Sequence, residues 1–563
     1  MARGEPSGVE RLKAASDYLR GNLAEELAAG GTQVTEDGYN LLKFHGSYEQ
    51  FDRDTATARK QRGLEKEYSF MVRVRMPGGR LTAAQYLALD ELANDRANGT
   101  LRITTRQGIQ FHGVTKGDLK PAIAAINDTL LTTMAACGDV ARNVMTSPAP
   151  IRDAVHARLE ADANMLSAAL VPQSRAYHEI FLDEEKSGEG DSEPLYGATY
   201  LPRKFKIALG IPEDNTVDVL TNDLGLVAIF DGDRLRGYNI AAGGGLGMTH
   251  NRADTFPRLG SIVGSVGPDD LLAAVHAVIA LFRDHGDRSD RKRARLKYVV
   301  EDRGVDWVRE TLIERYGLNL FEPLPMKPFR VPELLGWHGQ GDGRFWLGVP
   351  VPSGRIADTE GVGLRTALRE AVERFGLDPV MTPQQDVLLT NARAEDFAGI
   401  VALLRGHGVT LAEELTPLSR WALACPALPT CGLALTEAER VRPEIVGGIE
   451  DVLRRLGLAG ERISLRITGC PNGCARSYAG DIGLVGRIPG QYAIFVGGDF
   501  EGTVLSEKLL ERVRMADIAA SLEPLLAAWA AGRVPGQPFG AWCRAKGMDA
   551  LRALIPARDK AAA

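Results

Sequence analysis

The order of segments along the chain is repeated, and this repeat constrains the fold more than any other feature. VRMPGGRLT (74–82) is echoed by VPVPSGRIA (349–357), each an apolar strand that enters a Pro/Gly turn. In both copies a helical stretch and a second strand-like stretch follow. These are 83–96 and 362–375 for the helices, and TTRQGIQF (104–111) and TPQQDVLL (382–389) for the strands. The recurring order predicts an α+β unit that is used twice.

A second, larger repeat follows the first. FKIALGIPEDNTVDVLTNDLGLVAI (205–229) matches ISLRITGCPNGCARSYAGDIGLVGR (463–487), and IAAGGGLG (240–247) matches IFVGGDF (494–500). In this alignment Asp223 lies opposite Asp481. Chance similarity between glycine-punctuated strands is the alternative, but the matches occur in the same order in both halves. The sequence therefore predicts a duplicated, mixed α/β chain, each half holding a smaller and a larger module.

Composition excludes several classes of protein. The formal net charge of −6 over 563 residues does not suggest a nucleic-acid partner. The most apolar run, LLAAVHAVIALF (271–282), is too short to span a bilayer and predicts a buried helix. The N-terminal stretch lacks the apolar core of a signal peptide. We therefore expect a cytoplasmic protein with no membrane partner, in which clustered cysteines serve metal binding or catalysis rather than disulfides.

Four of the six cysteines form such a cluster in the second half. Cys425 and Cys431 are separated by five residues, and Cys470 and Cys474 by three. Four thiolates suit an iron–sulfur cluster or Zn²⁺, and the five-residue gap fits the tighter knuckles of structural zinc poorly. A metal-free turn is the third interpretation. The corresponding positions of the first half are Pro212 and Thr216, so only one copy would hold the metal. Cys543 is expected to be a structural thiol.

Cations gather instead in the first half. Four segments rich in Arg and Lys lie on predicted strands or loops, where residues two apart share a face. Like charges side by side on a buried face are costly unless an anion compensates them, so we expect a polyanionic cofactor, a small oxyanion, or both. The segments are 70–79, 101–113, 137–145 and 200–209, with the pairs Arg73/Arg75 and Lys204/Lys206. A fifth run, DRKRARLKY (290–298), is interpreted as a solvated helix or a partner surface.

Together these motifs resemble those of the sulfite/nitrite reductase haemoproteins. TGCPNGCARSYAGDIGLVG with CPALPTC resembles that family's siroheme and 4Fe–4S signature, and YLPRKFK, LRITTRQ, CGDVARNV and KFHGSYEQFDRD resemble its siroheme and substrate segments. The resemblance runs from about Ser16 to Gly498. It implies an α+β fold with two ferredoxin-like half-domains forming one domain, plus two larger siroheme-family α/β domains. The expected bounds are 1–60 (an arm), 61–135, 136–325, 326–410 and 411–563.

The resemblance also implies roles for particular residues. It implies a 4Fe–4S cluster on Cys425, Cys431, Cys470 and Cys474, with the Cys474 sulfur also an axial ligand of siroheme iron. Gly473 would let the backbone come close. The substrate oxyanion would meet Arg73, Arg142, Lys204 and Lys206. Candidates for contacting the carboxylates of siroheme are Arg102, Arg106, Gln110, His112, Arg203 and Asn472. Tyr48 and Cys137 occupy motifs in which some ferredoxin-dependent relatives form a tyrosine–cysteine link.

The activity that the resemblance implies is assimilatory sulfite reduction, in which sulfite loses three oxygens as water and takes up six electrons. A siroheme nitrite reductase is the nearest alternative, and a non-catalytic iron–sulfur or tetrapyrrole-binding protein is the other. The two lysines at 204 and 206 favour sulfite. The sequence has no flavin or nicotinamide fingerprint, so electrons must come from a partner. The residues of these motifs favour ferredoxin as the electron donor over a separate NADPH-oxidising flavoprotein subunit.

Overall fold

The structure is a computed structural model, and it describes residues 4–185 and 190–556. These residues form two compact units. The first unit holds residues 4–52, 65–245 and 260–409, and the second holds residues 53–64, 246–259 and 410–556. Among the helices of the described ranges, none is long and apolar enough to cross a membrane.

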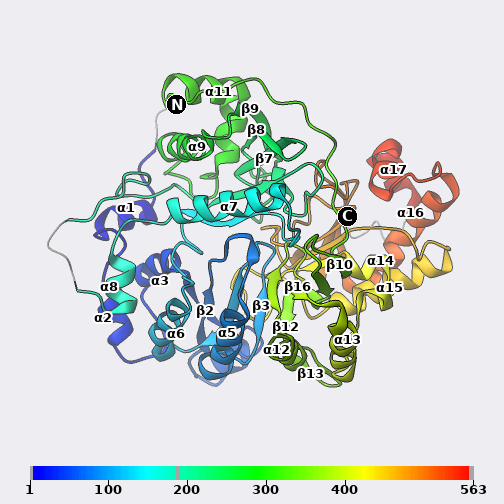
Figure 1. Cartoon of the computed structure of the whole chain (residues 1–563), viewed down its shortest axis with the longest axis horizontal. Coiled ribbons are helices and arrows are strands. Elements are labelled where there is room, and N and C mark those ends of the chain that lie inside the picture. Colours follow the sequence, from blue (N-terminus) through cyan, green and yellow to red (C-terminus); the bar gives the residue numbers. More distant parts are fainter. Residues whose placement is uncertain (1–3, 186–189, 557–563) are drawn as a thin grey trace. The chain divides into compact units, whose positions relative to one another are not determined.

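Two small sheets in the first unit correspond to the smaller repeated module (Figure 1). Each copy runs strand, helix, two strands and helix, so the duplicated α+β unit that the sequence predicts is confirmed. The first copy comprises β2 (Tyr68–Arg73), α5 (Ala83–Arg96), β3 (Leu101–Ile103), β4 (Ile109–Val114) and α6 (Lys116–Asp128). The second comprises β11 (Phe345–Val349), α12 (Leu364–Phe375), β15 (Asp378–Met381), β16 (Val387–Ala392) and α13 (Phe397–Gly406), with β10 (Gly336–Gly339) beside β11 and the short pair β13 (Asp358–Thr359) and β14 (Val362–Gly363).

The two copies contact each other through backbone hydrogen bonds at their turns. Strand β12 (Arg355–Ile356) of the second copy pairs with β3 of the first, and Arg80 of the first forms a bridge with Val380 of the second. A Cβ atom on Gly79 would lie 2.2 Å from the carbonyl oxygen of Met381. This close approach explains why the turn contains glycine at this position, and it joins the two copies of the smaller module within the first unit.

The larger module also occurs twice, once in each unit. Both sheets have five strands in sequential order, and in both the first three strands are parallel and the last two antiparallel. The first sheet holds β5 (Ala141–Met145), β6 (Phe205–Gly210), β7 (Leu224–Asp231), β8 (Arg234–Ala242) and β9 (Ser261–Val266). The second holds β17 (Ala422–Ala424), β18 (Leu465–Thr468), β19 (Ile482–Ile488), β20 (Gln491–Val496) and β21 (Glu507–Arg514).

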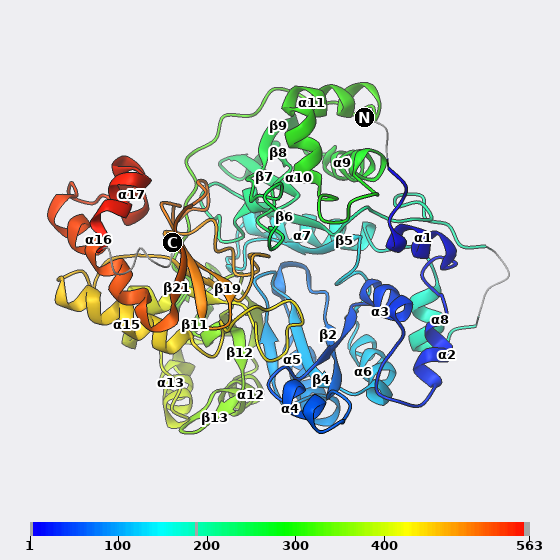
Figure 2. The same cartoon turned by 180° about the vertical axis from the view of Figure 1, so that it is seen from behind.

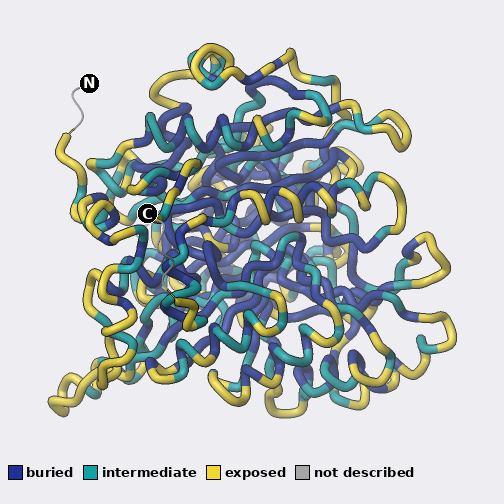
Figure 3. The backbone as a smooth tube through the Cα atoms, turned by 60° about the vertical axis from the view of Figure 1, so that its left-hand side comes forward, coloured by how far each residue is buried: buried dark blue, intermediate teal, exposed yellow. Residues whose placement is uncertain are grey.

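Helices cover these sheets, and the strands between them are mostly buried (Figures 2 and 3). Helix α9 (Leu271–His285) contains the apolar run 271–282, which confirms the prediction of a buried helix. The first unit adds α7 (Ala154–Ala169), α8 (Ala176–Leu182), α10 (Leu296–Arg303) and α11 (Val305–Glu314). The second adds α14 (Pro417–Arg420), α15 (Arg442–Arg455), α16 (Ile518–Gly532), α17 (Phe539–Lys546) and α18 (Met548–Leu554).

One buried aspartate repeats with the larger module. Asp223 Oδ2 accepts a hydrogen bond from the backbone N–H of Lys206 at 2.9 Å, and Asp481 Oδ2 accepts one from Ser464 at 2.9 Å. The two pairs stand at matching positions of the two sheets. The alignment made from the sequence is therefore confirmed residue by residue at this point.

The N-terminal segment is more ordered than the sequence suggests. It contains α1 (Gly8–Ala15), α2 (Leu23–Ala28), α3 (Glu36–Leu42), β1 (Ser47–Phe51) and, in the second unit, α4 (Ala56–Gln61). Strand β1 pairs antiparallel with β2, so this part of the segment belongs to a sheet. The domain bounds expected from the sequence stay a prediction.

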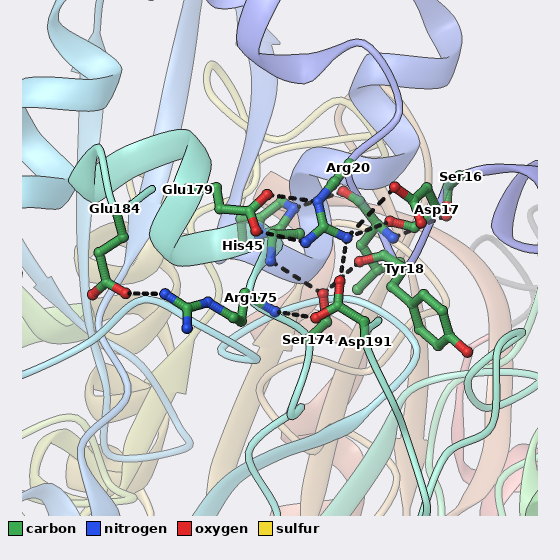
Figure 4. A network of polar contacts seen from close by, with 12 residues as sticks. Ser16, Asp17, Tyr18, Arg20, His45, Ser174, Arg175, Glu179, Glu184 and Asp191 are labelled. Carbon is green, nitrogen blue, oxygen red and sulfur yellow. Dashed lines mark hydrogen bonds and ion pairs between the residues drawn. The ribbon is translucent and has the colours of Figure 1, made fainter. Parts of the chain in front are cut away.

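Three consecutive residues near the N-terminus adopt the left-handed backbone conformation, with φ of 47°, 53° and 76° at Asp17, Tyr18 and Leu19. Such residues persist only where the surroundings fix them. Figure 4 shows the contacts: Ser174 Oγ donates to the Tyr18 carbonyl at 2.7 Å, and His45 Nε2 donates to the Leu19 carbonyl at 3.1 Å. Arg20 pairs with Glu179 and Asp191.

Candidate functional site

Arg73, at the end of β2, is fixed by three side chains. Its Nη1 donates to Cys137 Sγ at 2.9 Å, and its Nη2 donates to Tyr48 Oη at 3.2 Å. With the Gln110 amide turned as the hydrogen-bond network requires, its oxygen accepts from Arg73 Nε at 3.1 Å. A planar guanidinium held on several edges has a fixed orientation. Tyr48 and Cys137 thus contact the same guanidinium, and a covalent link between them stays a prediction.

Arg142, on β5, lies in the same region. Its Nε donates to the Gly138 carbonyl at 2.8 Å, and its Nη1 reaches the Ala136 carbonyl that Arg73 Nη1 also reaches, each at 3.5 Å. Burial lowers the pKa of Arg142, and the nearby charge of Arg73 adds to that shift. The structure therefore brings Arg73 and Arg142 together around one loop, and their role at the substrate stays a prediction.

Arg75 behaves differently from Arg73. It is 3% exposed, and its guanidinium donates to Ser167 and to the carbonyl oxygens of Ala141 and Ala135. Backbone carbonyls thus compensate this charge, and the inference that the Arg73/Arg75 pair needs an anion is wrong for Arg75.

Lys204 and Lys206 come from the start of β6. Lys204 immediately precedes the strand and Lys206 is its second residue. The carboxylate of Asp223 holds the Lys206 backbone and also forms a two-point ion pair with Arg295, at 2.9 and 2.8 Å. Lys297 Nζ donates to the Gly245 carbonyl at 3.1 Å, and burial lowers the pKa of Lys297 to about 6.

The run 290–298 is therefore not a solvated helix, so that part of the sequence interpretation is wrong, and a partner surface there stays a prediction. Arg295 is 8% exposed and Lys297 is fully buried, while Arg291 pairs with the buried Asp139 at 2.7 Å. Only residues from Leu296 onward are helical. Sequence reasoning missed these cations because each buried carboxylate partner lies far away in the chain, in a segment where single acidic residues are unremarkable.

Further cations lie close to the carboxylate of Asp139. Arg203 Nη1 lies 3.7 Å from its carboxylate, as does Lys13 Nζ of the N-terminal helix α1. Neighbouring cations hold the pKa of Asp139 well below its usual range, although its burial opposes that shift. Lys43, which the sequence did not single out, lies near this group, and burial followed by the charge of Arg291 lowers its pKa to about 8.

Some polar atoms at the predicted siroheme contacts lack a protein partner. Within the described ranges, His112 Nε2 and Arg106 Nε are buried and make no hydrogen bond. Arg102 is 2% exposed, and His112 Nδ1 bonds to Gln50 at 3.2 Å. Burial, with the nearby charge of Arg142, lowers the pKa of Arg106 to about 9. The orphaned Arg106 Nε donor among crowded cations fits a polyanionic group, because its carboxylates would satisfy both the donor and the charge.

His45, in contrast, is a structural histidine. It is buried, and its hydrogen bond goes to the Leu19 carbonyl. Burial lowers the pKa of His45 to about 4, so the ring is neutral near pH 7.

The four predicted metal ligands belong to the second unit. Cys425 directly follows β17, Cys431 lies in the loop between β17 and α15, and Cys470 and Cys474 follow β18. All four are free thiols, and Gly469 donates its N–H to Cys425 Sγ at 3.3 Å. Burial and then the charge of Cys474 raise the pKa values of Cys425, Cys431 and Cys470. The thiols thus lie near one another and repel as thiolates, which cations between them would relieve.

Their spacing bears on which metal would fit. Among His, Cys, Asp and Glu in residues 4–185 and 190–556, no group of three or more is placed to hold a single metal ion. A cube of four irons and four sulfides keeps its four thiolates farther apart than one tetrahedral zinc ion does.

The loop between Cys470 and Cys474 has the conformation that its glycine suggests. Gly473 has φ of 63°, and a Cβ atom there would lie 2.9 Å from the Tyr478 ring. Tyr478 Oη donates to the Pro471 carbonyl at 3.0 Å, and the Met248 N–H donates to the same oxygen at 2.9 Å. Asn472 lies beside Gly247, whose added Cβ would come within 3.2 Å of the Asn472 carbonyl.

Comparisons with known proteins match this arrangement of modules. The model described as "Nitrite/Sulfite reductase ferredoxin-like half domain" matches residues 62–129 and 338–407. The model described as "Nitrite and sulphite reductase 4Fe-4S domain" matches residues 161–320. That second match lies in the first copy of the larger module, whereas the four cysteines lie in the second, so their assignment rests on the residues themselves.

Similar proteins extend the match to nearly the whole chain. The "Sulfite reductase (NADPH) hemoprotein beta-component" of Myxococcus xanthus is 47% identical over 540 residues, covering 95% of each chain. The "Sulfite reductase (ferredoxin)" of Synechococcus elongatus is 44% identical over 567 residues, covering 97% of this chain and 90% of that protein. The solved structure of the Mycobacterium tuberculosis NirA protein shares the fold, with a TM-score of 0.81 at 24% identity over 97% of this chain and 98% of that one. The chain is thus a member of the nitrite and sulphite reductase family.

Proposed function

We propose that the chain is an assimilatory sulfite reductase that reduces sulfite to sulfide at a siroheme coupled to a 4Fe–4S cluster. The observation that carries this function is identity of 41–47% to eight sulfite reductases over at least 94% of this chain. The overall reaction is SO₃²⁻ + 6 e⁻ + 8 H⁺ → H₂S + 3 H₂O. When bound, siroheme supplies the iron at which sulfur is reduced, and the cluster supplies electrons.

The cations of the first unit bind and orient the oxyanion. Arg73 and Arg142 remain charged at any working pH, so they hold sulfite and stabilise the charge that develops on a departing oxygen. Contacts with Cys137, Tyr48 and Gly138 support this role, because they fix both guanidiniums before substrate arrives. Pre-oriented charges need no rearrangement as the reaction proceeds.

Lysines can deliver protons where arginines cannot. Lys204 and Lys206 each carry ammonium protons, one of which can pass to an oxygen that leaves as water. Asp223 supports this role for Lys206, since its carboxylate fixes the start of β6 from which both lysines project. The matching aspartate of the other copy, Asp481, holds Ser464, a residue with no charge to deliver.

The remaining assignments belong to cofactor binding. Arg102, Arg106, Gln110, His112, Arg203 and Asn472 would contact the siroheme carboxylates. Cys425, Cys431, Cys470 and Cys474 would hold the cluster, and Cys474 would also bind the haem iron. The unpaired Arg106 Nε donor supports the first set. We also place the protein in the cytoplasm and favour ferredoxin as the electron donor over an NADPH-oxidising flavoprotein subunit.

A viologen assay tests the function without the natural donor. The holoprotein is incubated anaerobically with dithionite-reduced methyl viologen and sulfite, and sulfide is counted against viologen oxidised. We expect one sulfide for every six viologens. A holoprotein that shows both cofactors by absorbance yet forms no sulfide contradicts the proposal and favours a binding protein instead.

A further inference from the structure

Arg53 contacts the loop that carries Cys431. It belongs to KFHGSYEQFDRD, a motif that resembles siroheme and substrate segments, yet its side chain turns to a proposed cluster ligand. Arg53 Nη1 donates to the carbonyl oxygens of Cys431 and Gly432 at 3.2 Å each, and to that of Ala434 at 3.5 Å. One guanidinium nitrogen thus binds three carbonyls of the same turn, which fixes the backbone at Cys431 and just after it.

The other side of this loop is fixed by the segment that carries Cys470. The N–H groups of Leu435 and Thr436 donate to the Gly469 carbonyl at 2.8 and 3.1 Å. The Gly469 N–H in turn donates to Cys425 Sγ at 3.3 Å. The loop is therefore held between the residues that follow β18 and the guanidinium that binds its carbonyls. A change at that guanidinium reaches the ligand set directly.

These loop contacts orient the charge of Arg53 without neutralising it. The acceptors are backbone carbonyls, which carry no net charge, and an arginine stays protonated at any working pH. The carboxylate of the next residue, Asp54, pairs with Arg440 at 2.6 Å. Burial and then the charge of Cys474 raise the pKa of Cys431, and the nearby charge of Arg53 acts against that shift. Arg53 therefore favours negative charge at Cys431.

We propose that Arg53 is a positioning residue for the 4Fe–4S cluster, which fixes the Cys431 loop and raises the midpoint potential of the cluster. This inference rests on the proposed function, which supplies the cluster and its ligands. Reduction adds one electron and no proton, so the site gains one negative charge. A fixed cation beside a ligand stabilises the reduced form more than the oxidised form. The cluster therefore accepts an electron more readily with Arg53 in place.

A redox titration followed by the EPR signal of the reduced cluster tests this proposal. Wild type and Arg53→Gln, which loses the charge and keeps an amide donor, are poised anaerobically with mediators and dithionite as the source of electrons. We expect the ratio of reduced to oxidised cluster at a fixed potential to fall about tenfold in the variant, a shift of about 59 mV for one electron. Iron and acid-labile sulfide per chain should stay at the wild-type values.

Lys60→Gln is the matched control. Lys60 is exposed on α4, and this substitution also removes one positive charge from the segment that follows Arg53. Water and salt screen an exposed charge, so the control should keep the wild-type ratio within twofold. Arg53→Lys should recover most of the loss, because it returns the charge. The proposal is overturned if Arg53→Gln keeps the wild-type potential, if Lys60→Gln shifts it as much, or if Arg53→Lys matches Arg53→Gln.

Metal analysis decides the case in which Arg53→Gln assembles no cluster. Full iron and sulfide content in Arg53→Lys, with the wild-type potential, then supports the proposal, and loss of the cluster in Arg53→Lys as well overturns it. The titration needs the cluster but not the reaction. If a wild type that carries the cluster forms no sulfide with viologen, the proposed function fails, and the potentials of the variants still test Arg53.

Discussion

Gln107 and Gln385 occupy equivalent positions in the two copies of the smaller module and make reciprocal contacts. Gln107 Nε2 donates to the Gly78 carbonyl of its own turn at 2.9 Å and to the Met381 carbonyl of the other copy at 3.4 Å. Gln385 Nε2 donates to the Ser353 carbonyl of its own turn at 3.2 Å and to the Ile103 carbonyl of the other copy at 3.5 Å. Both glutamines have positive φ, 58° and 74°. Each copy thus completes the hydrogen bonding of the other.

We expect Gln107→Ala to destabilise the protein by about 1–3 kcal/mol, because it leaves the buried Gly78 carbonyl and the Thr146 N–H without their partner. Differential scanning calorimetry of the holoprotein measures the loss of stability, with Gln61→Ala at an exposed position as the control. Gln107→Gly should lose less than Gln107→Ala, since glycine tolerates the positive φ. Equal midpoints for Gln107→Ala and the wild type would show that the contact contributes nothing.

Arg73→Lys should lower kcat/KM for sulfite about 10²–10³-fold in the viologen assay. A lysine cannot bond Cys137, Tyr48 and Gln110 at once, so the cation would lose its fixed orientation. Haem and cluster absorbance per chain should stay unchanged. Arg236→Lys, at an exposed site, is the control. A variant that retains wild-type kcat/KM would remove Arg73 from the substrate site.

Cys431→Ala should abolish the 4Fe–4S cluster, so that iron beyond the haem iron and acid-labile sulfide both disappear from the purified protein. Cys543→Ala is the matched control, because Cys543 is a buried thiol that lies outside the four cysteines. The metal analysis needs no activity. Full iron and sulfide content in Cys431→Ala would contradict the assigned ligand set.

His45 should make stability depend on pH in mildly acid solution. Its pKa is about 4 in the folded protein and 6.5 in the unfolded chain, because burial disfavours the charged ring. The unfolded chain therefore binds more protons below pH 6.5, and stability falls as pH falls from 6.5 towards 4, by about 1 kcal/mol per pH unit. His45→Gln should flatten this decline in melting temperature. An unchanged decline would assign it to other groups.

Much of the fold could be predicted because the duplication repeats local signals. The Pro/Gly turns, the helix at 83–96 and the Asp223/Asp481 match each appear twice, so each copy supports the other. The Cys470 loop could be predicted for a different reason: its glycine and proline restrict the backbone locally. Such features depend on neighbours in sequence.

The sequence-based interpretations were wrong where residues distant in the chain determine burial and pairing. Arg291 and Arg295 look like solvated charges until Asp139 and Asp223 are placed beside them. Arg75 looks like an anion ligand until carbonyls from another segment surround it. Strand β1 has little strand character of its own and exists because β2 offers it an edge. Burial and pairing of this kind are tertiary effects that no local sequence pattern indicates.

The measurement that tests the central claim most directly is the ratio of kcat/KM for sulfite to kcat/KM for nitrite, with one anaerobic preparation of holoprotein and reduced methyl viologen as the donor. The account predicts that sulfite is preferred by at least tenfold, because two lysines and two fixed arginines suit a doubly charged oxyanion that releases three waters. Preference for nitrite by an order of magnitude would contradict it and make the protein a siroheme nitrite reductase.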